Sequence, residues 1–111
     1  MSTQPSAPTA RDVVRQVAPK LIDLSEKVLF GDVWERPGLS KRDRSLITVA
    51  ALVALNRAEQ LPGHLRRAID NGVTEDELIE AITHLAFYAG WPVAMSAIVT
   101  AKKLFEPATD A

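Results

Sequence analysis

The side chains best suited to acid–base chemistry are the two histidines of the sequence, His64 and His84. An imidazole titrates near neutrality, so it can donate or accept a proton under physiological conditions. Glu80 precedes His84 by four residues, which places both on one helix face, where a carboxylate can fix the tautomer of the ring. The same spacing is typical of an ordinary helix-surface pair. Each histidine also lies beside an apolar stripe, where a packing role is the common alternative.

The other candidate groups are one carboxylate and several arginines, namely Glu59, Arg44, Arg57, Arg66 and Arg67. Adjacent arginines such as the last two usually form a solvated face. A metal site is weakly supported, because His64, His84 and a carboxylate have no metal-ligand spacing such as His-Glu-x-x-His. Ser45 and Ser96 lack the context of a nucleophilic triad. The absence of cysteine excludes disulfides, thiol nucleophiles, thiol redox relays and cysteine-ligated zinc.

Length and composition indicate one globular domain. The chain has 111 residues, of which 47% are hydrophobic and 24% charged. A net charge of −1 gives no electrostatic case for binding nucleic acid or an anionic membrane surface. Residues 1–10 lack the early cations and apolar core of a signal peptide and are expected to be a disordered arm. No run approaches the ~20 apolar residues of a spanning helix, so we expect a soluble, cytoplasmic protein.

Helical periodicity begins at Arg11 and continues to Phe30. Pro19 should divide this stretch into a short helix, a break and a second helix that ends near Phe30. Glycines and prolines then indicate a loop over 31–39. Trp34 lies in this loop, where a structural anchor and a wall of a ligand pocket are the two possible roles.

The segment 46–55 is apolar almost all round, as expected for a helix that is buried on every side. Ser40 and Asp43, just before it, resemble a capping box. A 111-residue chain has few ways to surround such a helix, so we expect an oligomer. A central helix in a compact monomeric bundle is the competing interpretation.

Three further helices follow. The first should start between Glu59 and Leu61 with an early proline and end at Asn71-Gly72. The second should start at a capping box formed by Thr74 and Glu77 and continue to residue 89. The third should run from Trp91-Pro92 to residue 105, leaving 106–111 as a frayed tail. No strand pattern appears, so the predicted fold is all-α, a compact bundle of about five to six helices.

Several segments together resemble the carboxymuconolactone decarboxylase family. They are Leu29-Phe30-Gly31-Asp32-Val33-Trp34, Leu39-Ser40-x-Arg42-Asp43-Arg44-Ser45-Leu46-x-Thr48-Val49-Ala50-Ala51-Leu52, Glu59-Gln60-Leu61-x-x-His64-x-x-x-Ala68-x-x-Asn71-Gly72 and His84-Leu85-Ala86-Phe87-Tyr88-Ala89-Gly90-Trp91-Pro92. The resemblance implies an alkylhydroperoxidase D-like helical domain over residues 11–105. It also implies assembly into a homo-oligomer through buried helices, as a trimer or as a hexamer that is a trimer of dimers.

The same superfamily contains thiol peroxidases whose relay combines Cys-x-x-Cys, a following histidine and an upstream glutamate. When their histidine is set on His64, Arg57 and Gln60 occupy the cysteine positions and Ser45 occupies the glutamate position. All three relay positions differ, so thiol peroxidase activity is not implied for this chain.

The enzyme that names the family removes CO2 from 4-carboxymuconolactone in the protocatechuate branch of aromatic degradation. It needs no cofactor, because the conjugated lactone can accept the electrons. The resemblance therefore implies a small carboxylated substrate and no metal. By that resemblance, the candidate catalytic residues are His64, His84 and Glu59, and the candidate substrate-binding residues are Arg44, Arg57, Trp34, Tyr88 and Trp91.

Each candidate has a definite role in such a reaction. Arg44 or Arg57 would hold a substrate carboxylate in bidentate geometry. His64 would donate a hydrogen bond to the lactone oxygen as charge develops. His84 or Glu59 would supply the proton that completes the reaction, and the three aromatic residues would close the pocket.

Two other functions remain open, because a fold does not fix an activity. One is a different enzyme on the same scaffold, such as an isomerase or ring-opening enzyme for a small carbonyl compound. The other is a non-enzymatic oligomeric binding or accessory protein. Turnover that survives replacement of both histidines would favour this third function or a different catalytic acid. Tight carboxylate binding without turnover would favour the binding protein.

Overall fold

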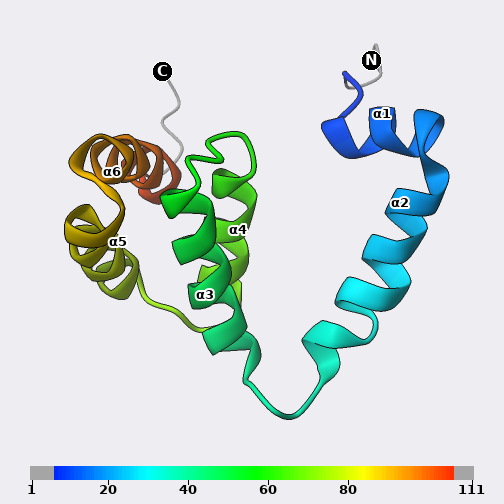
Figure 1. Ribbon diagram of the computed structural model, residues 1–111, viewed down its shortest axis with the longest axis horizontal. Coiled ribbons are helices and arrows are strands. Elements are labelled where there is room, and N and C mark those ends of the chain that lie inside the picture. The colour runs from blue at the N-terminus through cyan, green and yellow to red at the C-terminus, as the bar shows by residue number, and fades with distance from the viewer. Residues whose placement is uncertain (1–6, 107–111) are drawn as a thin grey trace, which may run out of the picture. The chain divides into compact units, whose positions relative to one another are not determined.

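The computed structural model describes residues 7–106, and its regular structure is helical throughout (Figure 1). The elements are α1 Ala10–Val17, α2 Pro19–Leu24, the π-helix η1 Ser25–Phe30, the 3-10 helix η2 Val33–Glu35, α3 Lys41–Ala54, α4 Leu61–Asp70, α5 Glu75–Ala89 and α6 Trp91–Phe105. The described residues contain no strand, so the all-α prediction is confirmed. The chain divides after Gly38 into two compact units, which are described separately.

The first unit consists of α1, α2, η1 and η2. Pro19 occupies the first position of α2, as predicted, and Ala18 before it has left the helical conformation. The side chain of Glu26 in η1 accepts hydrogen bonds from Arg11 and Arg15 of α1, which ties the two helices together. Exposed ion pairs of this kind contribute little individually.

The predicted terminal segments lie largely outside the described residues. Residues 1–6 of the predicted arm 1–10 and residues 107–111 of the predicted tail 106–111 are not described. The rest of the arm is ordered at its end, because Thr9 caps α1, which begins at Ala10. At the other end, Glu106 accepts a hydrogen bond from Lys102 at 2.7 Å.

The second unit packs α3, α4, α5 and α6 around one hydrophobic core. Each helix contributes two or three fully or almost fully buried side chains: Val49 and Val53, Leu61, Leu65 and Ala68, Leu78 and Ile82, and Ala94, Ala97 and Ala101. Burial of a Val, Leu or Ile side chain contributes about 1.5–3 kcal/mol. The small buried residues of α6 allow close helix approach.

The single chain leaves part of the apolar segment 46–55 exposed, so its burial on every side in an oligomer stays a prediction. In α3, Val49 and Val53 are buried, but Ile47 is 57% exposed and the following Leu55 is 62% exposed. The physical reason is that the other three helices of the unit cover only part of α3, because a domain of this size has too few elements to surround it. The remaining apolar surface of α3 faces outward in the described unit.

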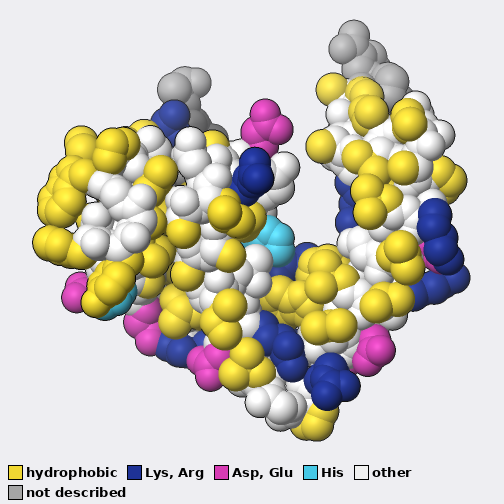
Figure 2. Space-filling view, viewed as in Figure 1, with side chains coloured by type: hydrophobic (Ala, Val, Ile, Leu, Met, Phe, Trp, Pro, Cys, Tyr) yellow, Lys and Arg dark blue, Asp and Glu magenta, His cyan; other side chains and the backbone are white. Residues whose placement is uncertain are grey.

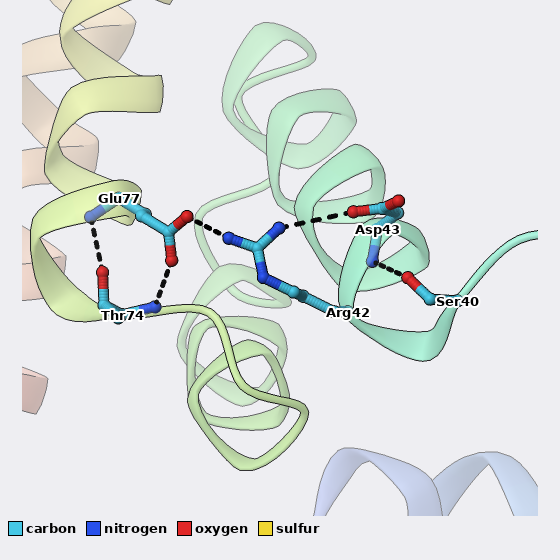
Figure 3. Close-up of polar contacts among 5 residues, drawn as sticks. All are labelled: Ser40, Arg42, Asp43, Thr74 and Glu77. Atoms are coloured by element: carbon cyan, nitrogen blue, oxygen red, sulfur yellow. Dashed lines mark hydrogen bonds and ion pairs between the residues drawn. The ribbon is translucent and has the colours of Figure 1, made fainter.

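Side-chain caps fix the starts of α3 and α5 (Figure 3). At α5, the capping box is complete: Thr74 accepts from the backbone N–H of Glu77 at 3.1 Å, and Glu77 accepts from that of Thr74 at 3.0 Å. At α3, Ser40 caps the N–H of Asp43, but the Asp43 carboxylate contacts Arg42 instead of returning to Ser40. Half of the predicted box is therefore formed. Arg42 also binds Glu77 and so links α3 to α5.

The end of α4 follows the sequence prediction. Gly72 has a positive φ of 98°, which glycine adopts without steric cost. The N–H of Gly72 donates to the Ile69 carbonyl at 3.0 Å, and that of Val73 donates to the Ala68 carbonyl at 2.9 Å. These two bonds form a Schellman motif. Gly90, which separates α5 from α6, likewise has a positive φ of 119°.

Candidate functional site

His64 is the candidate with the most unusual surroundings. It lies on α4, two residues after Pro62, and is half-buried. Its Nδ1 atom is buried and has no hydrogen-bond partner among the described residues. Burial lowers the pKa of the imidazole below its ordinary value of 6.5, and the positive charge of Arg67 lowers it further. At neutral pH the ring is therefore uncharged, with one nitrogen able to donate and the other able to accept.

His84 lies in different surroundings, on an exposed face of α5. Its ring stacks on Tyr88 with 4.9 Å between the ring centroids. It lines a groove of about 410 Å³ whose other walls come from α3 and α5, including Glu77 and Glu80. No residue of α4 lines this groove, so the groove does not join His84 to His64. Glu80 and His84 share no hydrogen bond within residues 7–106, and both side chains are exposed on α5.

The candidate arginines lie at opposite ends of α3. The Nε atom of Arg44 donates to the Leu39 carbonyl at 3.2 Å, which fixes this half-buried side chain near the start of the helix. Arg57 follows the end of the helix and is exposed, and so is Glu59 in the same turn. Within residues 7–106, the Arg57 guanidinium makes no ion pair or hydrogen bond. It is therefore free to bind an anion.

A Schellman motif positions Arg57. Asn56 has a φ of 56° and is the only non-glycine residue with positive φ among those described. Its N–H donates to the Val53 carbonyl at 3.1 Å, and the N–H of Arg57 donates to the Leu52 carbonyl at 2.8 Å. Asparagine tolerates this conformation better than other non-glycine residues. The turn thus fixes the backbone from which both side chains extend.

A small cavity of about 20 Å³ lies beside this turn. Its walls come from the end of α3, the turn itself, the start of α4 and one face of α6. The lining residues are Leu52, Val53, Asn56, Arg57, Ala58, Leu61, Val93, Ser96, Ala97 and Thr100. Sequence reasoning named Arg57 but assigned no binding role to Asn56 or Ser96. Asparagine directly after an apolar helix is a known helix-stop signal, whereas nothing in the sequence alone brings Ser96 to this turn.

The aromatic candidates lie in two places. In the first unit, Trp34 is 8% exposed and packs on Phe30 with 5.6 Å between ring centroids, as expected for a structural anchor. Tyr88 and Trp91 lie at the junction of α5 and α6 and are 79% and 56% exposed. Phe87 contacts Trp91 edge to face at 5.4 Å. The proposed pocket-closing role of these residues stays a prediction.

The positions of the thiol relay hold groups of another kind. Ser45 is buried, and its hydroxyl accepts a hydrogen bond from Asn71 at 2.9 Å, which joins α3 to the end of α4. Gln60 is exposed just before α4. Among residues 7–106, no three His, Asp or Glu side chains gather as a metal site would need. No helix in that part of the chain is long and apolar enough to cross a membrane.

Comparison with known proteins identifies the family. The sequence model of the carboxymuconolactone decarboxylase family matches residues 19–103. The 4-carboxymuconolactone decarboxylase of Acinetobacter baylyi is 48% identical over 77 residues, which are 69% of this chain and 58% of that protein. The nitrosuccinic acid decarboxylase of Metarhizium robertsii is 40% identical over 81 residues, which are 73% of this chain and 57% of that protein.

A third relative, an uncharacterized 15.0 kDa protein of Paracoccus denitrificans, is 31% identical over 78 residues, or 68% of this chain and 58% of that protein. The chain thus matches less than three-fifths of the length of each of these relatives. The family match itself covers most of the chain and includes α2 to α6. The chain belongs to the carboxymuconolactone decarboxylase family.

Proposed function

We propose that this protein is a cofactor-free carboxy-lyase that removes CO2 from a small carboxylated lactone of the 4-carboxymuconolactone type. The observation that carries the proposal is the uncharged, half-buried imidazole of His64, whose buried Nδ1 has no hydrogen-bond partner among residues 7–106. An unpartnered buried nitrogen is costly unless a ligand or water contacts it. Because Nδ1 is buried, the other nitrogen of this half-buried ring is the one that is available to donate a hydrogen bond to a substrate.

The names of two relatives support the reaction class. Both proteins are named as decarboxylases of a small acid with a second electron-withdrawing group, a lactone in one name and a nitro group in the other. Loss of CO2 leaves an electron pair on carbon, and a lactone or a nitro group can delocalise that pair. The enzyme then has to stabilise the oxygen that becomes negative and to return a proton.

The residues divide these tasks as follows. Arg57, with a guanidinium free of partners in the described structure, holds a substrate carboxylate, and Arg44 is the alternative cation. His64 donates a hydrogen bond to the oxygen that gains charge. His84 or Glu59 returns the proton to carbon. Both are exposed, so a proton from solvent can reach them.

The separation of these groups supports an oligomeric site. The groove at His84 is formed by α3 and α5 without α4, whereas His64 lies on α4. We propose a homo-oligomer, a trimer or a trimer of dimers, in which a second chain completes the pocket and Tyr88, Trp91 and Trp34 help to close it. Activity should then depend on assembly, and a fully active monomer would overturn this part of the proposal.

The test measures CO2 release from 4-carboxymuconolactone and, separately, from nitrosuccinate. We expect turnover of the lactone by the wild type and a loss of about 100-fold in His64→Gln, as for removal of a group that acts in proton transfer or charge stabilisation. Arg66→Gln, on the exposed face of the same helix, is the matched control and should keep full activity. Parallel measurements on His84→Gln and Glu59→Gln identify the proton donor.

The outcomes separate the competing functions. Turnover of nitrosuccinate but not of the lactone would keep the carboxy-lyase and change the substrate. Binding of either acid without turnover would favour a binding or accessory protein. Full activity in His64→Gln would remove His64 from the site and leave the family assignment unaffected.

A further inference from the structure

The cavity at the end of α3 has a polar side and an apolar side. Val53, Leu61 and Ala97 form part of its floor, and all three are buried. Asn56, Arg57 and Ser96 line it and are exposed, so this side of the cavity meets solvent. An apolar floor strengthens hydrogen bonds made at its surface, because the local dielectric constant is low.

Three polar side chains that line this cavity have hydrogen-bond donors without a partner among residues 7–106. The guanidinium of Arg57, the carboxamide of Asn56 and the hydroxyl of Ser96 form no side-chain hydrogen bond within residues 7–106. Thr100, which also lines the cavity, donates its hydroxyl to the Ser96 carbonyl at 3.1 Å and is already satisfied. No Asp or Glu lines the cavity, so its only formal charge is positive.

The size of the cavity limits what can bind. About 20 Å³ accommodates a group of roughly the size of one water molecule, whereas a whole lactone ring does not fit. An anionic oxygen or the end of a carboxylate fits this space, with the remainder of the molecule outside. A guanidinium, a carboxamide N–H and a hydroxyl are the donors that commonly bind a carboxylate.

We propose that this cavity binds one carboxylate of a small di- or tricarboxylic acid, with Arg57, Asn56 and Ser96 as its donors. The proposal rests on the proposed function, because it identifies where the substrate carboxylate that does not leave as CO2 is held. The Schellman turn preorganises the site, since the backbone positions of Asn56 and Arg57 are fixed before any ligand binds.

The test uses succinate, which cannot undergo the reaction, so binding is measured without catalysis. Titration of the isotope-labelled protein with succinate should shift the NMR signals of the Asn56 carboxamide and of the Arg57 and Ala58 amides. Dimethyl succinate, which has no charge, should leave them unchanged. Arg57→Gln should weaken succinate binding at least about tenfold, as expected for loss of a charge-assisted hydrogen bond.

Two further variants test the other donors with little risk to folding. Asn56→Gly keeps the left-handed turn, which glycine favours, and removes only the carboxamide. Ser96→Ala removes the hydroxyl within α6. Each should weaken succinate binding several-fold, in the range of about 3- to 10-fold that one hydrogen bond provides. Arg66→Gln, outside the cavity, should bind succinate like the wild type.

The outcomes test the carboxylate site and the proposed carboxy-lyase activity separately. Succinate binding at the cavity without turnover of the lactone or of nitrosuccinate would support the site and contradict the proposed function. Lactone turnover with an unchanged KM in Arg57→Gln would overturn the site and leave the carboxy-lyase intact. The site is also overturned if succinate shifts no signal near the cavity, which would then hold water only, or if Arg57→Gln and Arg66→Gln bind succinate equally.

Discussion

The Nδ1 atom of His64 is buried and has no hydrogen-bond partner among residues 7–106. A buried polar atom without a hydrogen bond costs about 1–3 kcal/mol. Burial also disfavours the positive charge of the ring, which lowers the pKa of His64. Both effects favour an uncharged imidazole, which keeps one N–H that can donate a hydrogen bond to a developing oxyanion.

The charge of Arg67 contributes to the pKa of His64. Arg67 lies three residues further along α4, and its positive charge opposes protonation of the ring. We expect Arg67→Gln to raise the pKa of His64 toward its ordinary value, because that repulsion is removed. Arg66→Gln is the matched control on the adjacent position and should leave the pKa unchanged. Titration of the His64 ring protons by NMR gives the answer, and equal values in both variants would contradict the attribution to Arg67.

The lowered pKa of His64 also makes stability depend on pH. The unfolded chain binds a proton at this residue more readily than the folded chain, since its pKa is near the ordinary 6.5. The contribution of His64 to the free energy of unfolding is therefore complete above pH 6.5 and is lost as the pH falls through the lower folded pKa. In urea denaturation from about pH 8 to about pH 5, His64→Gln should lose less stability than the wild type. Parallel pH profiles would show that the shift is absent.

At the scale of the helices, backbone conformation decides which glycine can be replaced. Gly72 has a φ of 98° and Gly63 lies within α4, and a Cβ would meet no atom within 4 Å at either position. Gly72→Ala should destabilise by about 1–2 kcal/mol, because alanine avoids a positive φ. Gly63→Ala should stabilise by up to about 1 kcal/mol, because alanine favours the helix. Thermal melting followed by circular dichroism compares the two, and a shift of the same sign in both would refute the backbone argument.

Helix ends were largely predictable from the sequence because their causes are local. Thr74 and Glu77 are three residues apart, and the box they form is complete in the structure. The box at Ser40 lacks its second hydrogen bond, which the sequence did not predict. The Arg42 guanidinium contacts both Asp43 of α3 and Glu77 of α5 (Figure 3). Arg42 is adjacent to Asp43 in the sequence, but its contact with Glu77 depends on how α3 packs against α5, which a local pattern does not specify.

The candidate site was predictable only in part, for the same reason. His64 is identifiable from its residue type, but its buried and unpartnered nitrogen depends on how α4 packs. The cavity beside Arg57 joins a turn to a residue of α6 about forty positions later in the sequence, Ser96. The proposed roles of Tyr88 and Trp91 remain predictions, because both lie on an apolar surface that the single chain leaves uncovered.

At the scale of the molecule, the surface of α5 and α6 is unusually apolar for a chain in water. Five large apolar side chains are more than half exposed there, namely Phe87, Tyr88, Trp91, Met95 and Val99. Hydrophobic side chains gather over these two helices (Figure 2). A groove of about 280 Å³ runs between the helices and is lined by several of the same residues. Large contiguous patches of this kind mark interaction surfaces in soluble proteins.

Assembly through this surface gives the last prediction. We expect the wild type to sediment as an oligomer, well above the 12.1 kDa of one chain. Met95→Glu places a charge on the groove and should shift the protein toward the monomer, since burying an unpaired carboxylate is strongly unfavourable. Lys103→Glu, a charge change on the same helix outside this patch, is the control and should leave assembly intact. If a second chain completes the pocket, lactone turnover should fall with assembly in Met95→Glu. A wild type that sediments as a monomer would remove both the interface and the shared site.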